Sequence, residues 1–131
     1  METDRIFILI KERIISRMNE ETLSLIDTEE TLIAALRGEI DHHSAAPIRT
    51  RIDEEMFRKR PQKLIIDIGD VDFMDSSGLG LILGRRAVTE EIGASLILED
   101  PGAGVQKILN LAGMERLITI RYGGSHEKLR K

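Results

Sequence analysis

The sequence predicts an α/β fold in which a mixed β-sheet, opened by an antiparallel hairpin and continued by mostly parallel strands, packs against helices. Leu64–Ile68 is a nearly continuous apolar run rich in β-branched residues, as in a strand buried on both faces. Short apolar runs alternate with amphipathic segments of about ten residues or more, and connections of that length imply right-handed crossovers between parallel strands. The 131 residues suit one domain with a single core.

Residues 1–20 precede this pattern and form an N-terminal extension. Apolar side chains recur there at helical spacing, with charged residues between them, at Phe7, Ile10, Ile14 and Met18. Ile6–Ile10 would also suit a strand, but we expect a helix. An apolar stripe of this kind needs to be covered, so we expect it either to pack on the sheet of its own domain or to form a homodimer.

Residues 21–122 carry the α/β domain, which begins with a hairpin. We expect strands at 23–26 and 31–36, joined by the polar turn 27–30, with Gly38 ending the second strand.

A helix is expected after Asp41-His42-His43-Ser44. Its apolar stripe is Ile48, Ile52 and Met56. We expect Pro47 in the first turn, where a missing N–H costs little, and Pro61 as the end of the helix.

A second helix of about four turns is expected beyond the central strand, between Ser76 and the C-terminal stop Gly93. Either Asp75 or Ser76 is its N-cap, because a side-chain oxygen there accepts a free backbone N–H. Its expected apolar face contains Leu79, Ile82, Leu83, Ala87 and Val88. The basic pair Arg85-Arg86 is expected on the solvated face.

The remaining elements are a strand at 94–98, a helix at 103–112 capped by Gly113, and a strand at 117–120. Residues 123–131 form a short charged tail that we expect to be flexible.

Composition excludes several classes of protein. A formal net charge of −4 with interspersed signs argues against a nucleic-acid partner, which would require a basic patch. The absence of cysteine excludes disulfides and thiolate zinc sites and fits a reducing compartment. No apolar run approaches the roughly twenty residues of a membrane span, and the N-terminus is unlike a signal peptide. We therefore expect a cytoplasmic protein without a membrane partner.

Two adjacent hydroxyls, Ser76 and Ser77, lie where the central strand should pass into a helix. The simple interpretation is a helix cap. The functional interpretation is a phosphorylation site, because free N–H groups and the helix dipole favour an anion at this position. The carboxylate of Asp75 would oppose the same phosphate, which carries about −1.5 to −2 charges.

Three segments together resemble one protein family. The stretch FMDSSGLGLILGRR at 73–86, the stretch LRGEIDHHSA at 36–45 and the stretch ILNLAGM at 108–114 are similar to the anti-sigma factor antagonist branch of the bacterial STAS domain family. The resemblance spans roughly residues 21–122. It implies a sheet of four or five strands with helices mainly on one side.

The resemblance also implies a function without catalysis. Such antagonists bind an anti-sigma factor that is a serine kinase, release a sigma factor, and are inactivated when the kinase phosphorylates a serine that a serine phosphatase later restores. By position, Ser76 resembles the phosphoacceptor, and Ser77 resembles the serine that helps to present the loop. Asp75 and Asp41 match the acidic residues of the family's site. We expect the partner-binding surface to comprise Asp41, Asp75, Ser77, Gly78 and Leu79.

Asp41 has independent physical support, because loops that follow neighbouring parallel strands gather at one end of a sheet. The extension at 1–20 departs from the compact family pattern.

Other interpretations are weaker. Asp41-His42-His43 shows no fourth metal ligand, so no metal site is expected. The glycines at 78, 80 and 84 miss both nucleotide-binding fingerprints and more plausibly let the helix pack closely on the sheet, so no cofactor is expected. A serine hydrolase would need a GxSxG turn and a triad, neither of which is evident. A scaffold protein of the same family within a larger signalling complex is the main alternative.

Overall fold

A five-stranded mixed sheet forms the centre of the domain, and its strand order follows the chain from β1 to β5. The structure is a computed structural model and describes residues 22–123. The expected helix and dimer contact of residues 1–20, and the flexible tail beyond residue 123, lie outside the described residues. The elements are β1 Leu23–Asp27, β2 Thr31–Ile40, α2 His42–Lys59, β3 Lys63–Met74, α3 Ser76–Ile92, β4 Ser95–Glu99, α4 Ala103–Leu111, the 3₁₀ helix η1 Met114–Arg116 and β5 Thr119–Arg121.

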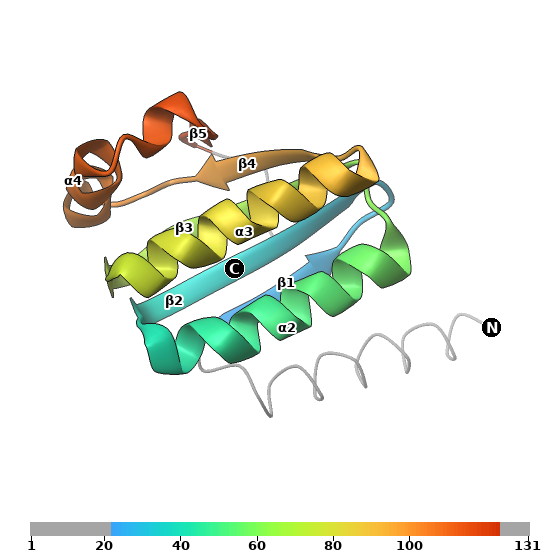
Figure 1. Cartoon of the computed structure of the whole chain (residues 1–131), viewed down its shortest axis with the longest axis horizontal. Coiled ribbons are helices and arrows are strands. Elements are labelled where there is room, and N and C mark those ends of the chain that lie inside the picture. The colour runs from blue at the N-terminus through green and yellow to red at the C-terminus, as the bar shows by residue number, and fades with distance from the viewer. Residues whose placement is uncertain (1–21, 124–131) are drawn as a thin grey trace.

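The predicted fold class is confirmed. Strands β1 and β2 pair antiparallel, and β2, β3, β4 and β5 pair parallel. Helices α2 and α3 run side by side across one face of the sheet, and α4 lies beyond one end of α3 (Figure 1). The core lies between these layers and joins buried residues of the strands and all three helices, among them Leu32, Leu64, Ile52, Ile82 and Leu109.

Both central strands are longer than predicted, and Gly38 does not end β2. The register of β2 against β3 shifts between Ala35 and Arg37 and again between Gly38 and Glu39, and Gly38 has a φ of +78°. A bulge at a glycine with positive φ bends a strand without ending its pairing. As a result, β2 continues to Ile40 beside Met74 of β3.

Pro47 lies in the second turn of α2, so its predicted place in the first turn is wrong. The helix begins at His42, because Asp41 is its N-cap. A proline this far into a helix removes one backbone hydrogen bond, to the carbonyl four residues earlier. The predicted end holds: Arg60 closes the helix in a left-handed conformation, directly before Pro61.

The buried face of α3 also differs from the prediction. Leu83 and Ala87 are exposed, whereas Arg85, expected in solvent, is buried. The face that packs on the sheet consists of Gly78, Leu81, Ile82, Arg85 and Thr89. An ion pair with α2 explains the buried arginine and is described below.

The last elements are shifted slightly. The segment after α4 forms η1, so β5 begins at Thr119 rather than at the predicted residue 117. Within residues 22–123, no helix combines the length and hydrophobicity that a membrane span requires.

Candidate functional site

Two helix starts lie next to each other at the ends of β2 and β3. Ile40 and Met74 are register partners in the parallel pair, and the N–H of Asp75 donates to the carbonyl of Ile40 at 3.2 Å. Asp41 and Asp75 follow these partners directly and are the N-caps of α2 and α3. The sequence prediction that Asp41 lies near the serine motif is therefore confirmed.

Asp75, rather than Ser76, is the N-cap of α3. Its Oδ1 accepts a hydrogen bond from the N–H of Ser77 at 2.8 Å. The side chain of Ser77 is half-buried, whereas Ser76, the first residue of the helix, is exposed. The cap thus fixes the backbone of both serines and leaves the hydroxyl of Ser76 on the surface.

Asp41 and Ser44 form a reciprocal cap at the start of α2. Oδ1 of Asp41 accepts from the N–H groups of His43 and Ser44 at 3.0 and 3.1 Å, and Oγ of Ser44 accepts from the N–H of Asp41 at 3.0 Å. The N–H of Ser44, foremost, with help from that of His43, holds the pKa of the Asp41 carboxyl below its ordinary value. This carboxylate therefore adds a fixed negative charge beside the serine motif at neutral pH.

Gly78 allows the first turn of α3 to approach the end of β3. A Cβ at this position would lie 2.7 Å from the Cβ of Met74, closer than real side chains approach. Gly80 and Gly84 have nothing within 4 Å of such a Cβ. The expectation that glycines permit close packing thus holds for Gly78 and is wrong for the other two. Leu79, the next residue, is half-buried against the core.

Further along, α3 is tied to α2 by an ion pair that the sequence did not predict. Nε of Arg85 lies 2.7 Å from Oδ1 of Asp53, and the Arg85 side chain is only 5% exposed. The contact lacks the alignment of a directed hydrogen bond. Burial lowers the pKa of Arg85 and raises that of Asp53, and in each case the attraction of the partner opposes the change. The pair fixes the two helices against each other behind their N-termini.

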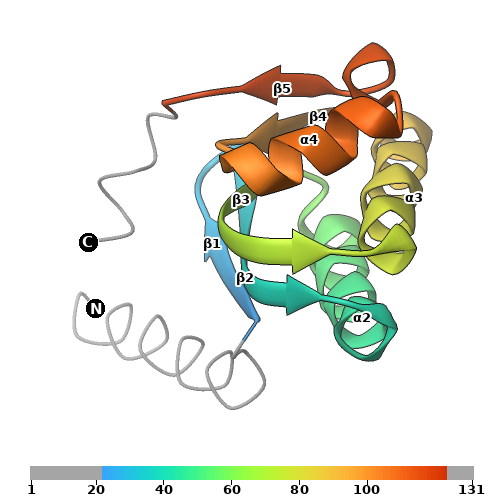
Figure 2. The same cartoon turned by 90° about the vertical axis from the view of Figure 1, so that its left-hand side faces the viewer.

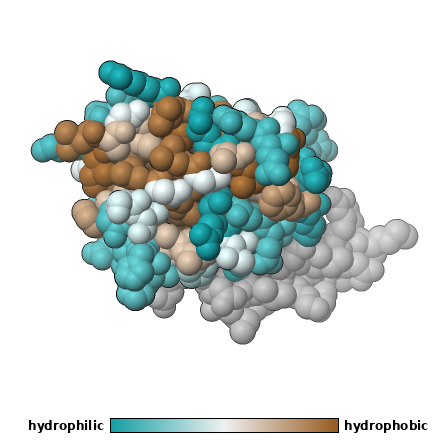
Figure 3. Space-filling view, viewed as in Figure 1, coloured by the Kyte–Doolittle hydropathy of each residue, from teal (hydrophilic) through white to brown (hydrophobic). Residues whose placement is uncertain are grey.

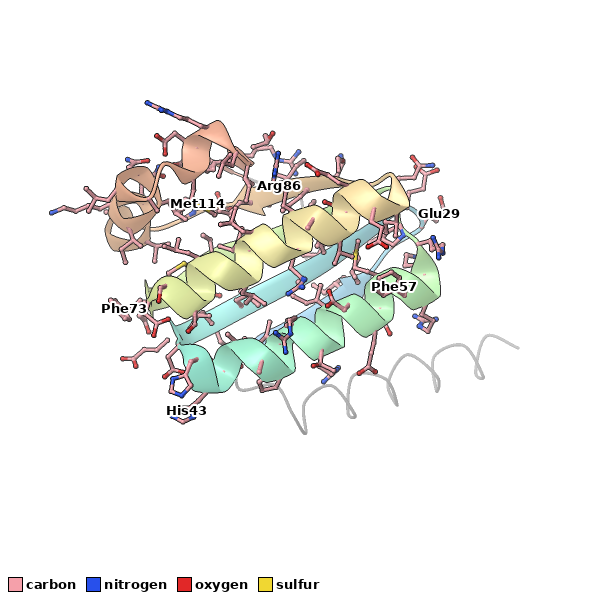
Figure 4. All side chains as sticks on the ribbon, in the orientation of Figure 1. Glu29, His43, Phe57, Phe73, Arg86 and Met114 are labelled. Carbon is pink, nitrogen blue, oxygen red and sulfur yellow. The ribbon has the colours of Figure 1, made fainter. Side chains whose placement is uncertain are left out.

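An apolar surface lies beside the serine motif. Figure 3 shows it on the face that carries α3 and α4. Leu83 of α3 and Leu111 of α4 are exposed, and Leu111 is 81% exposed. The other exposed large apolar side chains among residues 22–123 are Phe57, Phe73, Leu117 and Tyr122. Phe73 lies at the end of the molecule where α3 begins, and Phe57 lies toward the other end (Figure 4). Sequence reasoning missed this surface, because helical periodicity alone assigned Leu83 to the core.

The histidines at the start of α2 stack on each other, with ring centroids 4.0 Å apart. Among the described residues, no group of three histidine, cysteine, aspartate or glutamate side chains is placed to hold a metal ion.

Fold and site together define a small α/β domain with an exposed serine at a capped helix start. The chain belongs to the STAS domain family, whose model matches residues 22–124. An anti-sigma F factor antagonist of Paenibacillus polymyxa is 34% identical over 89 residues, which are 68% of this chain and 76% of that protein.

Two solved structures resemble the fold. The anti-sigma factor antagonist SpoIIAA in its unphosphorylated form superposes with a TM-score of 0.71 at 31% identity, covering 82% of this chain and 92% of that one. The Bacillus cell fate determinant SpoIIAA in its phosphorylated form gives a TM-score of 0.66 at 30% identity, covering 82% and 96%.

Proposed function

We propose that this protein is an anti-sigma factor antagonist that binds a kinase-type anti-sigma factor, frees a sigma factor, and is switched off by phosphorylation of Ser76. The observation that carries the proposal is the exposed hydroxyl of Ser76, placed on a fixed helix start within a family whose relatives include anti-sigma factor antagonists. Its partners are the kinase and a serine phosphatase, which would act on it in the cytoplasm.

Local geometry favours Ser76 over Ser77 as the acceptor. The side chain of Ser77 is half-buried, and its N–H is occupied by the cap, so a kinase would have to open the first turn to reach it. Ser76 needs no such opening. Its backbone is already held by the Asp75 cap, and this reduces the entropy lost when a kinase positions the hydroxyl.

Charge supplies the switch. The unmodified site already carries the carboxylates of Asp41 and Asp75, and a phosphoryl group on Ser76 would add about −1.5 to −2 charges. The helix N-terminus tolerates this charge within the protein. An interface that buries phosphorylated Ser76 would have to remove water from the phosphate. Negatively charged groups of the partner across that interface would also repel the phosphate.

A binding function suits this site better than hydrolysis. Asp41, the carboxylate next to His42 and His43 in the chain, is engaged by backbone N–H groups and so does not orient an imidazole as a triad would require. The half-buried Leu79 and the apolar surface with Leu111 offer the apolar anchor that a protein interface needs beside a polar centre.

The test combines phosphorylation with binding. The full chain is incubated with the kinase encoded in the same genome and ATP, and intact mass then counts the added phosphoryl groups. We expect one group in the wild type and in Ser77→Ala, and none in Ser76→Ala. Addition to Ser76→Ala, or no addition to the wild type, would contradict the proposed acceptor.

Binding of the unmodified variants to the kinase tests the mechanism. Ser76→Ala should bind constitutively, whereas Ser76→Asp should bind at least tenfold more weakly. Leu111→Glu should also weaken binding, and Phe57→Glu, at another exposed apolar residue toward the other end of the molecule, should not. Equal affinity of Ser76→Ala and Ser76→Asp would rule out the electrostatic switch and favour a constitutive scaffold.

A further inference from the structure

The outer side of α3 carries Ser76 at one end of an uncharged stripe. Spacings of four, three and four residues place Ser76, Gly80, Leu83 and Ala87 on one side of the helix, and all four are exposed. None of these residues is charged, and none is larger than leucine. A partner that covers Ser76 and follows α3 as far as Ala87 therefore meets mainly small and apolar groups.

Helix α4 continues this surface near the start of α3. In the view of Figure 2, α4 and the starts of α2 and α3 lie together at the end of the molecule that faces the viewer. Leu79 of α3 and Ile108 of α4 are both half-buried against the core, and Leu111, the last residue of α4, is 81% exposed. We call Leu79, Leu83, Ile108 and Leu111 the α3–α4 surface.

The charge of α4 is opposite in sign to that of the whole chain. Lys107 is the only charged residue of α4, whereas the chain has a formal net charge of −4. Lys107 is exposed and precedes Leu111 by four residues, so the two side chains are neighbours on the surface of the helix. Arg116 of η1 is exposed as well. Within residues 22–123, no ion pair involves either of these two cations.

The cations of α3 differ, because each has a carboxylate partner. Nε of Arg85 lies 2.7 Å from Oδ1 of Asp53, and an Nη of Arg86 lies 3.1 Å from an Oε of Glu90. Arg86 lies on the side of α3 toward η1 (Figure 4), so its charge is already compensated there. The positive charge that is available to a partner on this face therefore lies on α4 and η1.

We propose that the α3–α4 surface binds an apolar segment of the anti-sigma factor that is flanked by acidic residues, and that Lys107 selects this segment. The inference rests on the proposed function, in which the kinase is the partner that covers Ser76. Apolar anchors supply most of the affinity of such an interface, whereas charges at its edge speed association and exclude partners of like charge.

The two edges of the interface fix the orientation of the partner. The edge at the helix starts carries the carboxylates of Asp41 and Asp75, and the edge at α4 carries the ammonium group of Lys107. A partner that places acidic groups beside Lys107 is attracted in this orientation. The reversed orientation brings like charges together at both edges, which is unfavourable.

Binding of the full chain to the kinase encoded in the same genome, at about 50 mM and about 500 mM salt, tests the charge. Lys107→Glu reverses it and Lys107→Gln removes it. The matched control is Lys63→Glu at the start of β3, since Lys63 also forms no ion pair among residues 22–123 and lies at the opposite end of that strand from the serine motif.

At low salt, Lys107→Glu should bind about fivefold more weakly than the wild type or worse, with Lys107→Gln between them and Lys63→Glu unchanged. At high salt the differences should shrink, because salt screens exposed charges. Equal affinity of Lys107→Glu and Lys63→Glu would overturn the proposal, and so would tighter binding by Lys107→Glu. A loss of the same size at both salt concentrations would also overturn it, because the substitution would then act through packing.

Phosphoryl transfer separates a failure of this inference from a failure of the proposed function. Lys107→Glu should raise the KM of the kinase for this chain and leave kcat unchanged, because Lys107 contributes to docking and not to the transfer. One phosphoryl group on Ser76 of both proteins with the same KM would overturn the role of Lys107 alone. A wild-type chain that neither binds the kinase nor gains a phosphoryl group would overturn the proposed function, and this inference with it.

Discussion

Gly78 is the residue that sets how closely α3 begins against β3. Gly78→Ala would drive a methyl group into the Cβ of Met74, and overpacking of this kind costs about 1–3 kcal/mol. Gly80 lies two residues further along α3, and a Cβ there would have nothing within 4 Å. Gly80→Ala should therefore stabilise the protein by up to about 1 kcal/mol through the higher helix propensity of alanine. Urea unfolding of the two variants measures the difference. Equal effects would show that the close approach does not constrain the site.

Asp41, the N-cap of α2, and Asp53, within that helix, should have pKa values on opposite sides of the ordinary value of 3.8. The N–H of Ser44 lowers the pKa of Asp41, and burial raises that of Asp53. Asp41 therefore contributes stability that is present above pH 3.8 and lost as pH falls through its lower folded pKa. Asp53 binds its proton more tightly when folded, so its contribution falls as pH rises from 3.8 through its higher folded pKa.

Carboxyl carbon shifts measured by NMR between pH 2 and 7 would resolve both groups. Asp41→Asn should remove the part of the pH dependence of unfolding below 3.8 that belongs to this group. Transitions for both carboxyls on the same side of that value would contradict the assignment of one to capping and the other to burial.

Between the elements α2 and α3, the Asp53–Arg85 pair is a largely buried polar link. Removing one partner of a buried pair costs about 3–5 kcal/mol, because it strands a buried charge. We expect a loss near the lower end for Asp53→Ala, since the Asp53 side chain is itself 25% exposed. Glu90→Ala breaks the exposed Arg86–Glu90 pair on the same helix and should cost about 0.5 kcal/mol or less.

The control for this prediction is the double substitution Asp53→Leu with Arg85→Met, which removes both charges. Replacing a buried pair by apolar residues is often neutral or stabilising, so this variant should unfold at a higher denaturant concentration than Asp53→Ala. A midpoint below that of Asp53→Ala would mean that the attraction between the two charges stabilises the fold, and that the loss in Asp53→Ala does not come mainly from the unpaired Arg85.

The same elements show how far the sequence predicts the structure. Every described helix and strand apart from η1 was expected, and the caps of α3 at Asp75 and Gly93 were found because capping is a local property of a few residues. The bulge at Gly38 was missed, because the pairing of β2 with β3 sustains the strand. Arg85 was misplaced, because its partner Asp53 lies on another helix and only the folded structure brings the two together.

In the candidate site, too, the sequence predicted the features that depend on a few neighbouring residues and missed those that depend on how elements pack. Local signals and the family resemblance indicated Ser76 and its neighbours, and parallel pairing then placed Asp41 beside Asp75. The apolar surface with Leu111 depends on how α4 packs against β3, which no spacing in the sequence determines.

On the scale of the whole molecule, phosphorylation of Ser76 should change binding without changing the fold. The added phosphate meets favourable N–H groups and dipole at the start of α3 and an unfavourable carboxylate at Asp75, and these effects are each of order 1 kcal/mol and opposite in sign. The buried core lies beneath this turn and loses no contact when an exposed oxygen is modified. The similarity of this chain to a relative's structure in both unphosphorylated and phosphorylated forms agrees with a fold that survives modification.

Thermal unfolding of the phosphorylated chain should accordingly occur within a few degrees of the unmodified chain, because about 1 kcal/mol shifts the midpoint of a domain of this size by only about 2–8 °C. Amide NMR shifts should change around the starts of α2 and α3 and stay constant in β4 and β5. Widespread shifts, or a large fall in the midpoint, would mean that phosphate acts by loosening the domain. Loss of partner binding with both quantities preserved would leave surface charge as the switch.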